Sequence, residues 1–463
     1  MKKSRILALL LCLCMLVGVL AACSKTDTTT PDASGETAQS GDAAKTGDTA
    51  KTGDVVTIRM WGGVPAESGP QAACDAFNEA YKDKGIQVEY ERFVNDDTGN
   101  VKLETNLLGG NEIDVYMSYT MAQLSKRAEG NMALDLTELC ERDGFDLTQY
   151  LGDLAKNYYV DGKPFCIPCK LDQYGMVVNK TMFDEAGIEV PTEWTYDEFL
   201  DVCAKLTHGE GTDKVYGVFW NSQQDMAQYA QFMIQQTLGG DNMYTADGTA
   251  TNFTDDVWQK TISLISTTMN EGYAPTHADS VTEKLSQESM FLGGKAAMTI
   301  GPWMVRNIKD TETYPHDFVT AFAPYPVVSE DQRNYTQGGY GDLLCINPRS
   351  EHLDEAWEFA KWYLTEGGLY LASGGRVPAA NTYNADDVVN AFLSGAENLF
   401  DADSTKAVLI TPHDNYAAPS ITTKNAELTD IINEELESIY TGQKTVEEGL
   451  ESAKTRGDAA LAG

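Results

Sequence analysis

Basic residues are scarce in this 463-residue sequence, which has 34 lysines and arginines against 70 aspartates and glutamates. The formal net charge is −36 at pH 7. A surface of that sign repels phosphate groups, so the composition argues against nucleic acid or anionic lipid head groups as partners. It places no limit on a neutral small solute.

The motifs of common enzyme chemistry are also missing. No GxSxG, HExxH, Walker or dinucleotide GxGxxG pattern occurs in the sequence. The histidines are few and lack the spacing of metal ligands: His208, His277, His316, His352 and His413. We therefore expect no metal, no cofactor and no catalytic residue, and a protein that is not an enzyme.

The cysteines favour structure over redox chemistry. Cys166 and Cys169 form a CxxC pair, but they stand in the extended, proline-containing stretch KPFCIPCK. A redox CxxC needs a helix N-terminus to lower the thiol pKa, so we expect either a structural disulfide or free buried thiols. The same two alternatives apply to the other cysteines beyond the N-terminal region: Cys74, Cys140, Cys203 and Cys345.

The N-terminus has the pattern of an export signal. Lys2, Lys3 and Arg5 precede an apolar stretch at 6–20, and small residues before a cut site are typical of such signals. The sequence LAAC, ending at Cys23, resembles a bacterial lipobox, which implies cleavage before Cys23 and a diacylglyceryl group on its sulfur. The alternative is an ordinary signal peptide cut near Ala22. No other apolar run approaches the 18 residues of a membrane span.

Residues 24–54 contain no aromatic and no large aliphatic residue. Such a segment cannot bury enough surface to offset the entropy of ordering, so we expect a disordered tether. Its root-mean-square reach would be roughly 30 Å. The protein would then be extracytoplasmic and anchored to the cell membrane through Cys23.

From residue 55 onward, strand and helix patterns alternate. The expected order is strand 55–60, helix 71–84, strand 86–93, helix 101–108 and strand 113–117. This alternation favours a parallel sheet with helices on both faces. Ligands of such sheets lie beyond the carboxyl ends of the strands. Trp61, Tyr119 and Trp303, which follow predicted strands, should therefore share one rim if those strands are parallel neighbours.

Several short segments together resemble family 1 extracellular solute-binding proteins, the substrate-capturing lipoproteins of bacterial ABC importers, most often for sugars. The segments, in chain order, are VNKTMFDEAGI at 178–188, WTYDEF at 194–199, FLGGKAAMTIGPW at 291–303, AWEFAKWY at 356–363, RVPA at 376–379 and EELESIYTGQKTVEEGL at 434–450. Each segment is short, and their order and spacing carry the resemblance. Val178 and Ile113 depart from the Tyr and Pro that are usual in the family.

The resemblance implies an α/β, two-lobe periplasmic-binding-protein-like fold of type II, with each lobe a sheet flanked by helices. The expected divisions are a signal peptide at 1–22, lipidated Cys and tether at 23–54, lobe 1 at 55–167 plus 301–343, lobe 2 at 172–298 plus 346–463, and hinge crossings at 168–171, 299–300 and 344–345. It also implies a monomer that closes on a carbohydrate ligand and is read by ABC-transporter permease subunits.

A carbohydrate site needs flat rings for the C–H faces of the sugar and hydrogen-bonding groups for its hydroxyls. The aromatic candidates are Trp61, Tyr119, Trp220, Trp303, Tyr340 and Tyr416. The polar candidates are Glu67, Asp172, Gln223, Gln224, Arg376 and Asp414. The other tryptophans follow helical patterns or helix entries and are expected in the core: Trp194, Trp258, Trp357 and Trp362.

The resemblance favours two of these candidates. Trp303, in the Gly-Pro-Trp turn, matches a stacking tryptophan of maltodextrin-binding relatives, and Asp172 stands at the hinge where those relatives place a carboxylate against sugar hydroxyls. Each aromatic candidate could instead belong to the core, and an ion pair would equally explain Arg376 or Asp414. Two functions also stay open as alternatives: a binder of a polyamine, peptide or metal chelate on the same fold, and an exported glycoside hydrolase with two carboxylates across a cleft.

Overall fold

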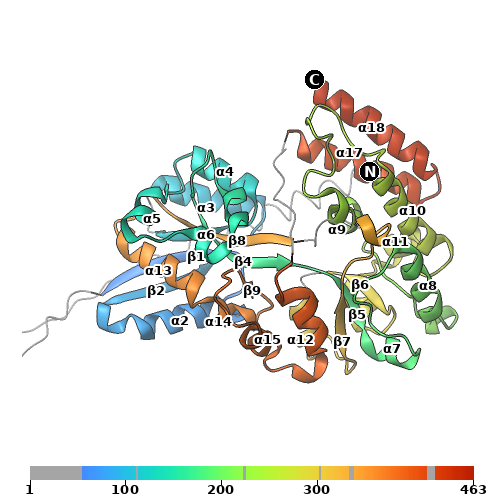
Figure 1. Ribbon diagram of the computed structural model, residues 1–463, viewed down its shortest axis with the longest axis horizontal. Coiled ribbons are helices and arrows are strands. Elements are labelled where there is room, and N and C mark those ends of the chain that lie inside the picture. The colour runs from blue at the N-terminus through green and yellow to red at the C-terminus, as the bar shows by residue number, and fades with distance from the viewer. Residues whose placement is uncertain (1–54, 111–112, 223–225, 302–303, 333–337, 414–422) are drawn as a thin grey trace, which may run out of the picture. The chain divides into compact units, whose positions relative to one another are not determined.

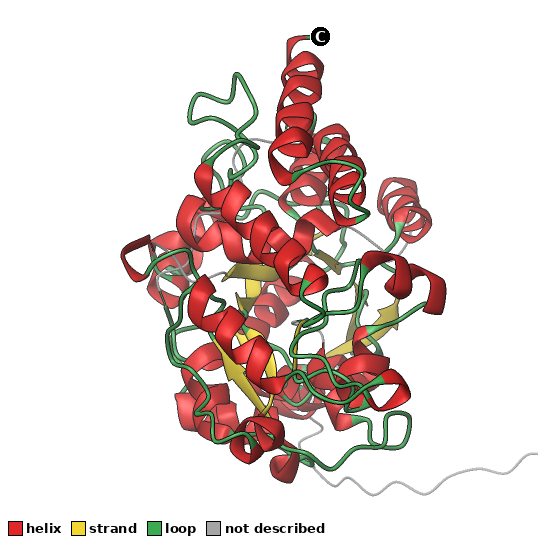
Figure 2. Ribbon diagram, turned by 90° about the vertical axis from the view of Figure 1, so that its right-hand side faces the viewer, coloured by secondary structure: helices red, strands yellow, loops and turns green. Residues whose placement is uncertain are grey.

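The computed structural model describes residues 55–110, 113–222, 226–301, 304–332, 338–413 and 423–463. They belong to one compact unit, Thr52–Gly463. Within this unit, helices surround two separate β-sheets, one of six strands and one of three (Figures 1 and 2). We call each sheet with its covering helices a lobe, the six-stranded one being the first lobe.

The sheet of the first lobe has the strand order β2-β1-β3-β8-β4-β9. Its strands are β1 (Val56–Gly62), β2 (Ile86–Arg92), β3 (Val115–Ser118), β4 (Ile167–Gln173), β8 (Gly338–Ile346) and β9 (Val377–Pro378). β1 pairs in parallel with both β2 and β3, which confirms the parallel arrangement expected from the sequence. β8 runs antiparallel between β3 and β4.

Alternate residues of β1 face the two helical layers of this lobe, because successive side chains of a strand point to opposite faces. Ile58 and Met60 pack with α2 (Pro70–Ala80) and α13 (Leu353–Thr365). Trp61 packs on the other side with Leu103 and Leu107 of α3 (Asp97–Gly109) and with α4 (Met121–Glu129). Helices thus cover both faces of the sheet, and the ends of its strands lie outside these two contact surfaces.

The sheet of the second lobe has the order β6-β5-β7, with both outer strands antiparallel to β5. Its strands are β5 (Met176–Asn179), β6 (Met298–Ile300) and β7 (Thr320–Ala323). The helices packed in its core are α7 (Lys180–Glu185), α8 (Tyr196–Leu206), α9 (Met226–Leu238), α10 (Asp256–Asn270), α17 (Asn425–Tyr440) and α18 (Val446–Ala462). Trp194 and Trp258 are buried in this core, as the sequence predicts.

The remaining α-helices are short. They are α5 (Thr137–Asp143), α6 (Leu147–Leu151), α11 (His277–Glu283), α12 (Met304–Lys309), α14 (Gly368–Ala372), α15 (Ala385–Leu393) and α16 (Ala402–Thr405). α12, α14 and α15 contribute to an apolar cluster that also includes Leu171 of β4, Val177 of β5 and Phe322 of β7. This cluster joins strands of both sheets into one packed region.

Strand pairing corrects the division into lobes expected from the sequence. β7 pairs with β5 in the second sheet, although 301–343 was assigned to lobe 1. α13 packs on the first sheet, although 346–463 was assigned to lobe 2. The expected crossings at 168–171, 299–300 and 344–345 lie inside β4, β6 and β8 and are not crossings. The chain instead passes between the sheets after β4, between β7 and β8, and after β9.

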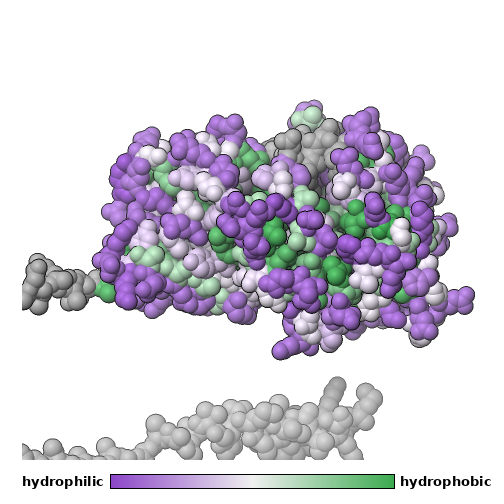
Figure 3. Space-filling model, turned by 60° about the horizontal axis from the view of Figure 1, so that its bottom comes forward, coloured by the Kyte–Doolittle hydropathy of each residue, from purple (hydrophilic) through white to green (hydrophobic). Residues whose placement is uncertain are grey.

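The surface is mixed in character. On the face drawn in Figure 3, hydrophilic residues predominate and hydrophobic ones form separate patches. The exposed large hydrophobic residues of the described chain are scattered along the sequence: Val55, Val94, Val101, Leu108, Val281 and Tyr370. Single exposed hydrophobic residues of this kind are ordinary on a protein surface. Among the described helices, none combines the length and apolarity that a membrane span requires.

Candidate functional site

Several sequence-predicted site residues lie outside the described part of the chain: Gln223, Gln224, Trp303, Asp414, Tyr416 and the lipidation candidate Cys23. The strand before Trp303 is described, however, and it is β6 of the second sheet. The expectation that the Gly-Pro-Trp turn shares a sheet edge with Trp61 and Tyr119 is therefore wrong, because β1 and β3 belong to the first sheet.

Two tyrosines hold the loop that follows β1. The Tyr90 hydroxyl donates to the Val64 carbonyl oxygen at 2.6 Å, and the Gly63 N–H donates to the Tyr119 hydroxyl at 2.5 Å. A Cβ atom on Gly62 would lie 2.6 Å from the Tyr90 hydroxyl oxygen, so a larger residue there would displace the Tyr90 ring. Burial raises the pKa of both phenols, which keeps them protonated.

Tyr119 has hydrogen-bonding capacity left over. Its oxygen accepts from Gly63, and among the described residues its own proton has no acceptor. A phenol can donate one hydrogen bond while accepting others. The half-buried Tyr119 therefore offers a fixed donor at the carboxyl end of β3, where the sequence predicted a ligand contact.

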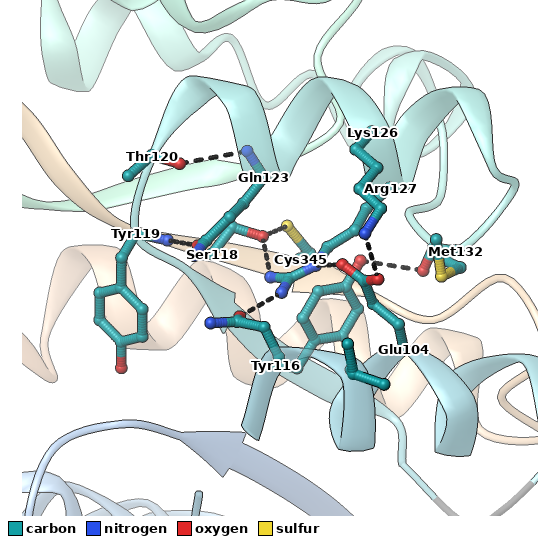
Figure 4. A network of polar contacts seen from close by, with 12 residues as sticks. Glu104, Tyr116, Ser118, Tyr119, Thr120, Gln123, Lys126, Arg127, Met132 and Cys345 are labelled. Carbon is teal, nitrogen blue, oxygen red and sulfur yellow. Dashed lines mark hydrogen bonds and ion pairs between the residues drawn. The ribbon is translucent and has the colours of Figure 1, made fainter. Parts of the chain in front are cut away.

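A buried polar network holds the end of β3 in place (Figure 4). The fully buried Arg127 of α4 donates to Ser118 Oγ at 2.8 Å and to Asn100 Oδ1 at 2.6 Å, and it pairs with Glu104 at 3.4 Å. In the close-up, the Tyr119 ring points away from this network. The network thus fixes the backbone next to Tyr119 and leaves its ring for other contacts.

Arg376 and Asp342 form an ion pair beside this loop. Arg376 Nε lies 2.7 Å from Asp342 Oδ2, and the exposed fractions of the two side chains are only 18% and 8%. Tyr90 and Tyr119 are both close enough for the two charges to act on their pKa. An ion pair was one of the alternatives for Arg376, and the structure shows it.

Asp342 adopts an unusual backbone conformation for a residue inside a strand. Its φ is +47°, in the left-handed region that costs energy for any residue with a Cβ atom, although aspartate tolerates it better than most. Such strain persists only where surrounding contacts impose it. Here the contact is the ion pair with Arg376, which the conformation of Asp342 allows.

Asp172 lies on β4 in a second polar group. The Tyr174 hydroxyl donates to Asp172 Oδ1 at 2.5 Å, and Lys170 forms an ion pair with the same carboxylate oxygen. Lys170 and Asp172 are each about one-fifth exposed, at 20% and 23%. The carboxylate is therefore positioned by two neighbours and still reaches solvent, as a ligand contact requires.

Tyr340 is half-buried on β8, next to the same region. Its N–H donates to the Tyr158 hydroxyl at 2.5 Å, its own hydroxyl donates to the Leu151 carbonyl oxygen, and the two rings lie 5.6 Å apart. Burial raises the pKa of Tyr340 to about 12. Its hydroxyl is thus engaged within the protein, and only its ring could serve a ligand.

The other described candidates lie elsewhere. Trp220 is 3% exposed in the core of the second lobe, where its Nε1 donates to Thr268 Oγ1 at 2.8 Å. Trp61 is 8% exposed, and it lines a hollow of about 750 Å³ together with Lys102 of α3, whose Nζ lies 5.0 Å from the indole ring centre. Glu67 lies exposed in a short turn before α2. Both tryptophans are almost fully buried.

The six described thiols are all free: Cys74, Cys140, Cys166, Cys169, Cys203 and Cys345. Cys166 packs with one side of the first sheet and Cys169 with the other, because residues three apart on an extended chain point to opposite faces. The CxxC pair is therefore two separate core thiols, which is one of the two outcomes expected. In the described part of the chain, no cluster of potential metal ligands occurs.

Sequence reasoning missed several polar residues of this region: Tyr90, Lys170, Tyr174, Arg306 and Asp342. One signal was present for Lys170 and Tyr174, since they stand two residues on either side of Asp172 and therefore share its side of an extended strand. Asp342 gave no local signal, and the sequence did not identify it as the partner of Arg376. Their pairing depends on β8 and β9 being brought together across β4.

Comparison with known proteins agrees with this architecture. A family described as bacterial extracellular solute-binding protein matches residues 62–369. The multiple sugar-binding protein of Streptococcus mutans is 24% identical over 218 residues, which cover 46% of this chain and 50% of that protein. The chain thus spans about half the length of this curated relative.

Solved structures show the same fold at low sequence identity. A sugar transporter from Rhizobium etli in an open conformation superposes with a TM-score of 0.70 at 21% identity, covering 87% of this chain and 99% of that one. The sugar-binding protein MalE from Xanthomonas citri gives 0.66 at 19%, covering 88% and 98%. The cyclic alpha-maltosyl-1,6-maltose binding protein from Arthrobacter globiformis gives 0.65 at 21%, covering 88% and 99%.

These likenesses establish the α/β, two-lobe fold. The family match covers more than half of the chain and concerns proteins that bind solutes, in agreement with the expectation that this protein is not an enzyme. The chain belongs to the bacterial extracellular solute-binding proteins.

Proposed function

We propose that this protein captures a carbohydrate outside the cytoplasm and delivers it to the permease subunits of an ABC importer. The observations that carry the proposal are two held polar groups of the first lobe: Tyr119 with the neighbouring Arg376–Asp342 pair, and the Asp172 carboxylate on β4. Similar proteins from several bacteria are described as sugar-binding or maltose-binding proteins, which supports a carbohydrate as the solute.

The chemistry of these groups suits hydroxylated ligands. Tyr119 supplies a hydroxyl donor and a ring, Asp172 supplies carboxylate oxygens that accept from sugar hydroxyls, and Arg376 supplies further N–H donors. All three are held by neighbouring protein groups, so little side-chain entropy is lost when a ligand binds. Trp303 and Tyr340 are the proposed stacking rings, and Glu67, Gln223, Asp414 and Tyr416 the remaining proposed contacts.

Capture would use both lobes. β4 of the first sheet leads through Tyr174 and Gly175 directly into β5 of the second, so rotation near this crossing changes the angle between the lobes. A ligand that touches both lobes stabilises the closed state by its differential contacts. The permease subunits would recognise that closed monomer.

The N-terminal segment would anchor the protein to the membrane. Cleavage before Cys23, diacylglyceryl attachment to its sulfur and a disordered tether at 24–54 would leave the folded unit within reach of the importer. In the producing bacterium, Cys23→Ser should abolish incorporation of labelled palmitate, whereas Cys140→Ser should leave it unchanged. Equal labelling of both variants would contradict the anchor.

A thermal-shift screen over mono- and oligosaccharides tests the carbohydrate assignment, followed by calorimetry on the hits. At least one carbohydrate should raise the melting temperature in a concentration-dependent way. Tyr119→Phe, which removes only the hydroxyl, should weaken binding about tenfold, the scale of one hydrogen bond, and Tyr216→Phe in the second lobe should not. The absence of any shift, or steady release of reducing ends from oligosaccharides, would overturn the assignment.

A further inference from the structure

Three arginines gather beside the loop that follows β1, in a chain where acidic residues outnumber basic ones 70 to 34. They come from separate elements: Arg92 ends β2, Arg306 lies in α12, and Arg376 immediately precedes β9. Opposite charges normally intersperse on such a surface, so a local excess of positive charge here needs an explanation.

The backbone brings the three residues together. Arg92 is the register partner of Gly62 on β1, so it stands next to the loop that Tyr90 and Tyr119 hold. Gly375, next to Arg376, packs so closely on Val305, next to Arg306, that a Cβ atom on the glycine would lie 3.1 Å from the valine side chain. The pKa of Arg306 is lowered mainly by partial burial and to a smaller extent by the positive charges of Arg376 and Arg92. The second cause agrees with the three arginines being neighbours.

The positive charges are only partly balanced within the protein. Asp342 pairs with Arg376 through Nε, which leaves the two terminal amino groups of that guanidinium without a hydrogen-bond partner among the described residues. Arg92 and Arg306 form no ion pair within the described chain, and both are exposed. The three arginines together with Asp342 therefore carry a net positive charge.

The strained conformation of Asp342 suggests that this arrangement is imposed by the fold. Asp342 has a φ of +47° inside β8, and with this backbone conformation its carboxylate lies against Arg376 Nε. The Nε–H and the terminal amino groups of a guanidinium lie in one plane. Fixing the Nε side thus fixes the direction in which the terminal donors point, as a site for a planar anionic group requires.

We propose that the carbohydrate captured by this protein carries an anionic group, a uronate carboxylate, which binds to Arg306, Arg92 and the terminal amino groups of Arg376. This inference rests on the proposed function and names its substrate class. Guanidinium groups recognise carboxylates through paired N–H donors. The sugar ring would lie against Tyr119 and Asp172, with its hydroxyls on the polar groups of β4 and its carboxylate toward the arginines.

Calorimetry on matched ligand pairs tests the proposal with the full-length protein. Each pair consists of an oligosaccharide containing galacturonate or glucuronate and the same compound with its carboxyl reduced to the alcohol. The acidic member should bind at least about tenfold more tightly, the scale of one strong charge-assisted contact. This preference should shrink as sodium chloride is raised, because exposed charges are screened.

Variants assign the preference to the arginines. Arg306→Gln and Arg92→Gln should each reduce the preference for the acidic member several-fold while leaving the affinity for the neutral member unchanged. The matched control is Arg349→Gln, another exposed arginine, which donates to the Asn131 carbonyl oxygen beyond the opposite end of β8. It should leave both affinities as they are.

The outcomes separate this inference from the proposed function. Equal or tighter binding of the neutral member would overturn the anionic substrate and leave carbohydrate capture standing. Binding of no carbohydrate would overturn both. A preference for the acidic member that survives Arg306→Gln and Arg92→Gln together would overturn the assigned residues, and tight binding of sugar phosphates or sulfates without uronates would overturn the carboxylate.

Discussion

At the scale of single residues, Arg127 and Lys126 allow a direct comparison of a buried and an exposed charge. Both pair with Glu104, but the Arg127 side chain is 0% exposed and the Lys126 side chain is 64% exposed. Removing one partner of a buried, hydrogen-bonded ion pair costs about 3–5 kcal/mol. We expect Arg127→Met to lower the free energy of unfolding by about that amount, and Lys126→Met by less than about 1 kcal/mol.

Urea unfolding monitored by tryptophan fluorescence measures the free energy of unfolding of each variant. Because Arg127 also fixes Ser118, the residue before Tyr119, its replacement should weaken ligand binding as well. Similar losses of stability in Arg127→Met and Lys126→Met would contradict the view that the buried network holds the end of β3.

The thiols provide a second test at this scale. The pKa of the half-buried Cys140 is raised to about 11, mainly by burial and to a smaller extent by nearby carboxylates. Burial raises the pKa of Cys74 to about 12. At pH 8 only about one in a thousand Cys140 groups would be the reactive thiolate. We therefore expect slow alkylation by iodoacetamide at Cys140 and none at the buried cysteines until the protein unfolds.

Mass spectrometry of the alkylated peptides identifies the labelled thiols, and a sample in guanidinium chloride shows that all can react. Labelling of Cys166 or Cys169 at the rate of Cys140 in the native protein would be inconsistent with their burial. It would also revive the redox interpretation of the CxxC pair.

Single residues also mark the limit of sequence-based site prediction. Tyr119 was a candidate because ligands of such sheets lie beyond the carboxyl ends of the strands, and it does follow the last residue of β3; its contact with a ligand stays a prediction. The sequence around Trp220 offered no means of telling a platform from a core residue, and only its hydrogen bond to Thr268 and its burial reveal its place. The Arg376–Asp342 pair joins positions 34 residues apart, which no local pattern encodes.

At the scale of elements, the hairpin of α17 and α18 depends on one buried carboxylate. Glu435 on α17 accepts from Ser452 Oγ and Arg456 Nη1, both at 2.8 Å, and pairs with Lys444. Burial alone would raise the pKa of Glu435, but these hydrogen bonds outweigh it and hold the pKa below its ordinary value. The charged form therefore stabilises the hairpin.

The sign of the pH dependence follows from that shift. In the unfolded chain Glu435 titrates near 4.5, its ordinary value, whereas the folded state takes up the proton only at lower pH. Its contribution is therefore complete above about pH 4.5 and is lost as the pH falls through the folded pKa. We expect Glu435→Gln to cost about 1–3 kcal/mol at pH 7 and progressively less in acid.

Glu434→Gln is the matched control for this prediction. Glu434 pairs with the same Arg456, but its side chain is 63% exposed, so its loss should cost less than about 1 kcal/mol. Denaturant unfolding at pH 7 and at several pH values below 4.5 gives the loss of unfolding free energy for both variants. A Glu435→Gln penalty that does not shrink with falling pH would contradict the assigned titration.

Element prediction succeeded where the signals are local. The capping box of Thr195 and Glu198 starts α8 as the sequence indicates. The sequence predicted an extended stretch at KPFCIPCK and a crossing at 168–171, whereas the structure has the strand β4 there. In the structure Pro168 lies opposite Leu343 of β8, and β9 pairs only with Lys170 and Leu171.

At the scale of the whole molecule, the order of segments in the sequence does not reveal which lobe each one joins. β7 and α13 both depart from the expected division, because each lobe is completed by segments that follow a crossing. Strand content and helix content were predictable from local patterns, whereas the assignment to a sheet depends on pairing between distant residues. The same holds for the crossings between the sheets, which lie after β4, between β7 and β8 and after β9 and not at 299–300.

The last prediction concerns the closing of the two lobes on a ligand. A bound solute that contacts both lobes should reduce the radius of gyration measured by small-angle X-ray scattering, and it should stabilise the protein by about 2.7 kcal/mol at a ligand concentration 100 times Kd. The radius of gyration should saturate, whereas the stabilisation should keep rising with the logarithm of the ligand concentration; both curves should yield the same Kd, because both report the same binding event. Asp172→Asn, next to the crossing from β4 to β5, should shift both curves to higher ligand concentration together. A thermal shift without compaction would show that the ligand binds to one lobe only, and the capture mechanism proposed for this protein would then fail.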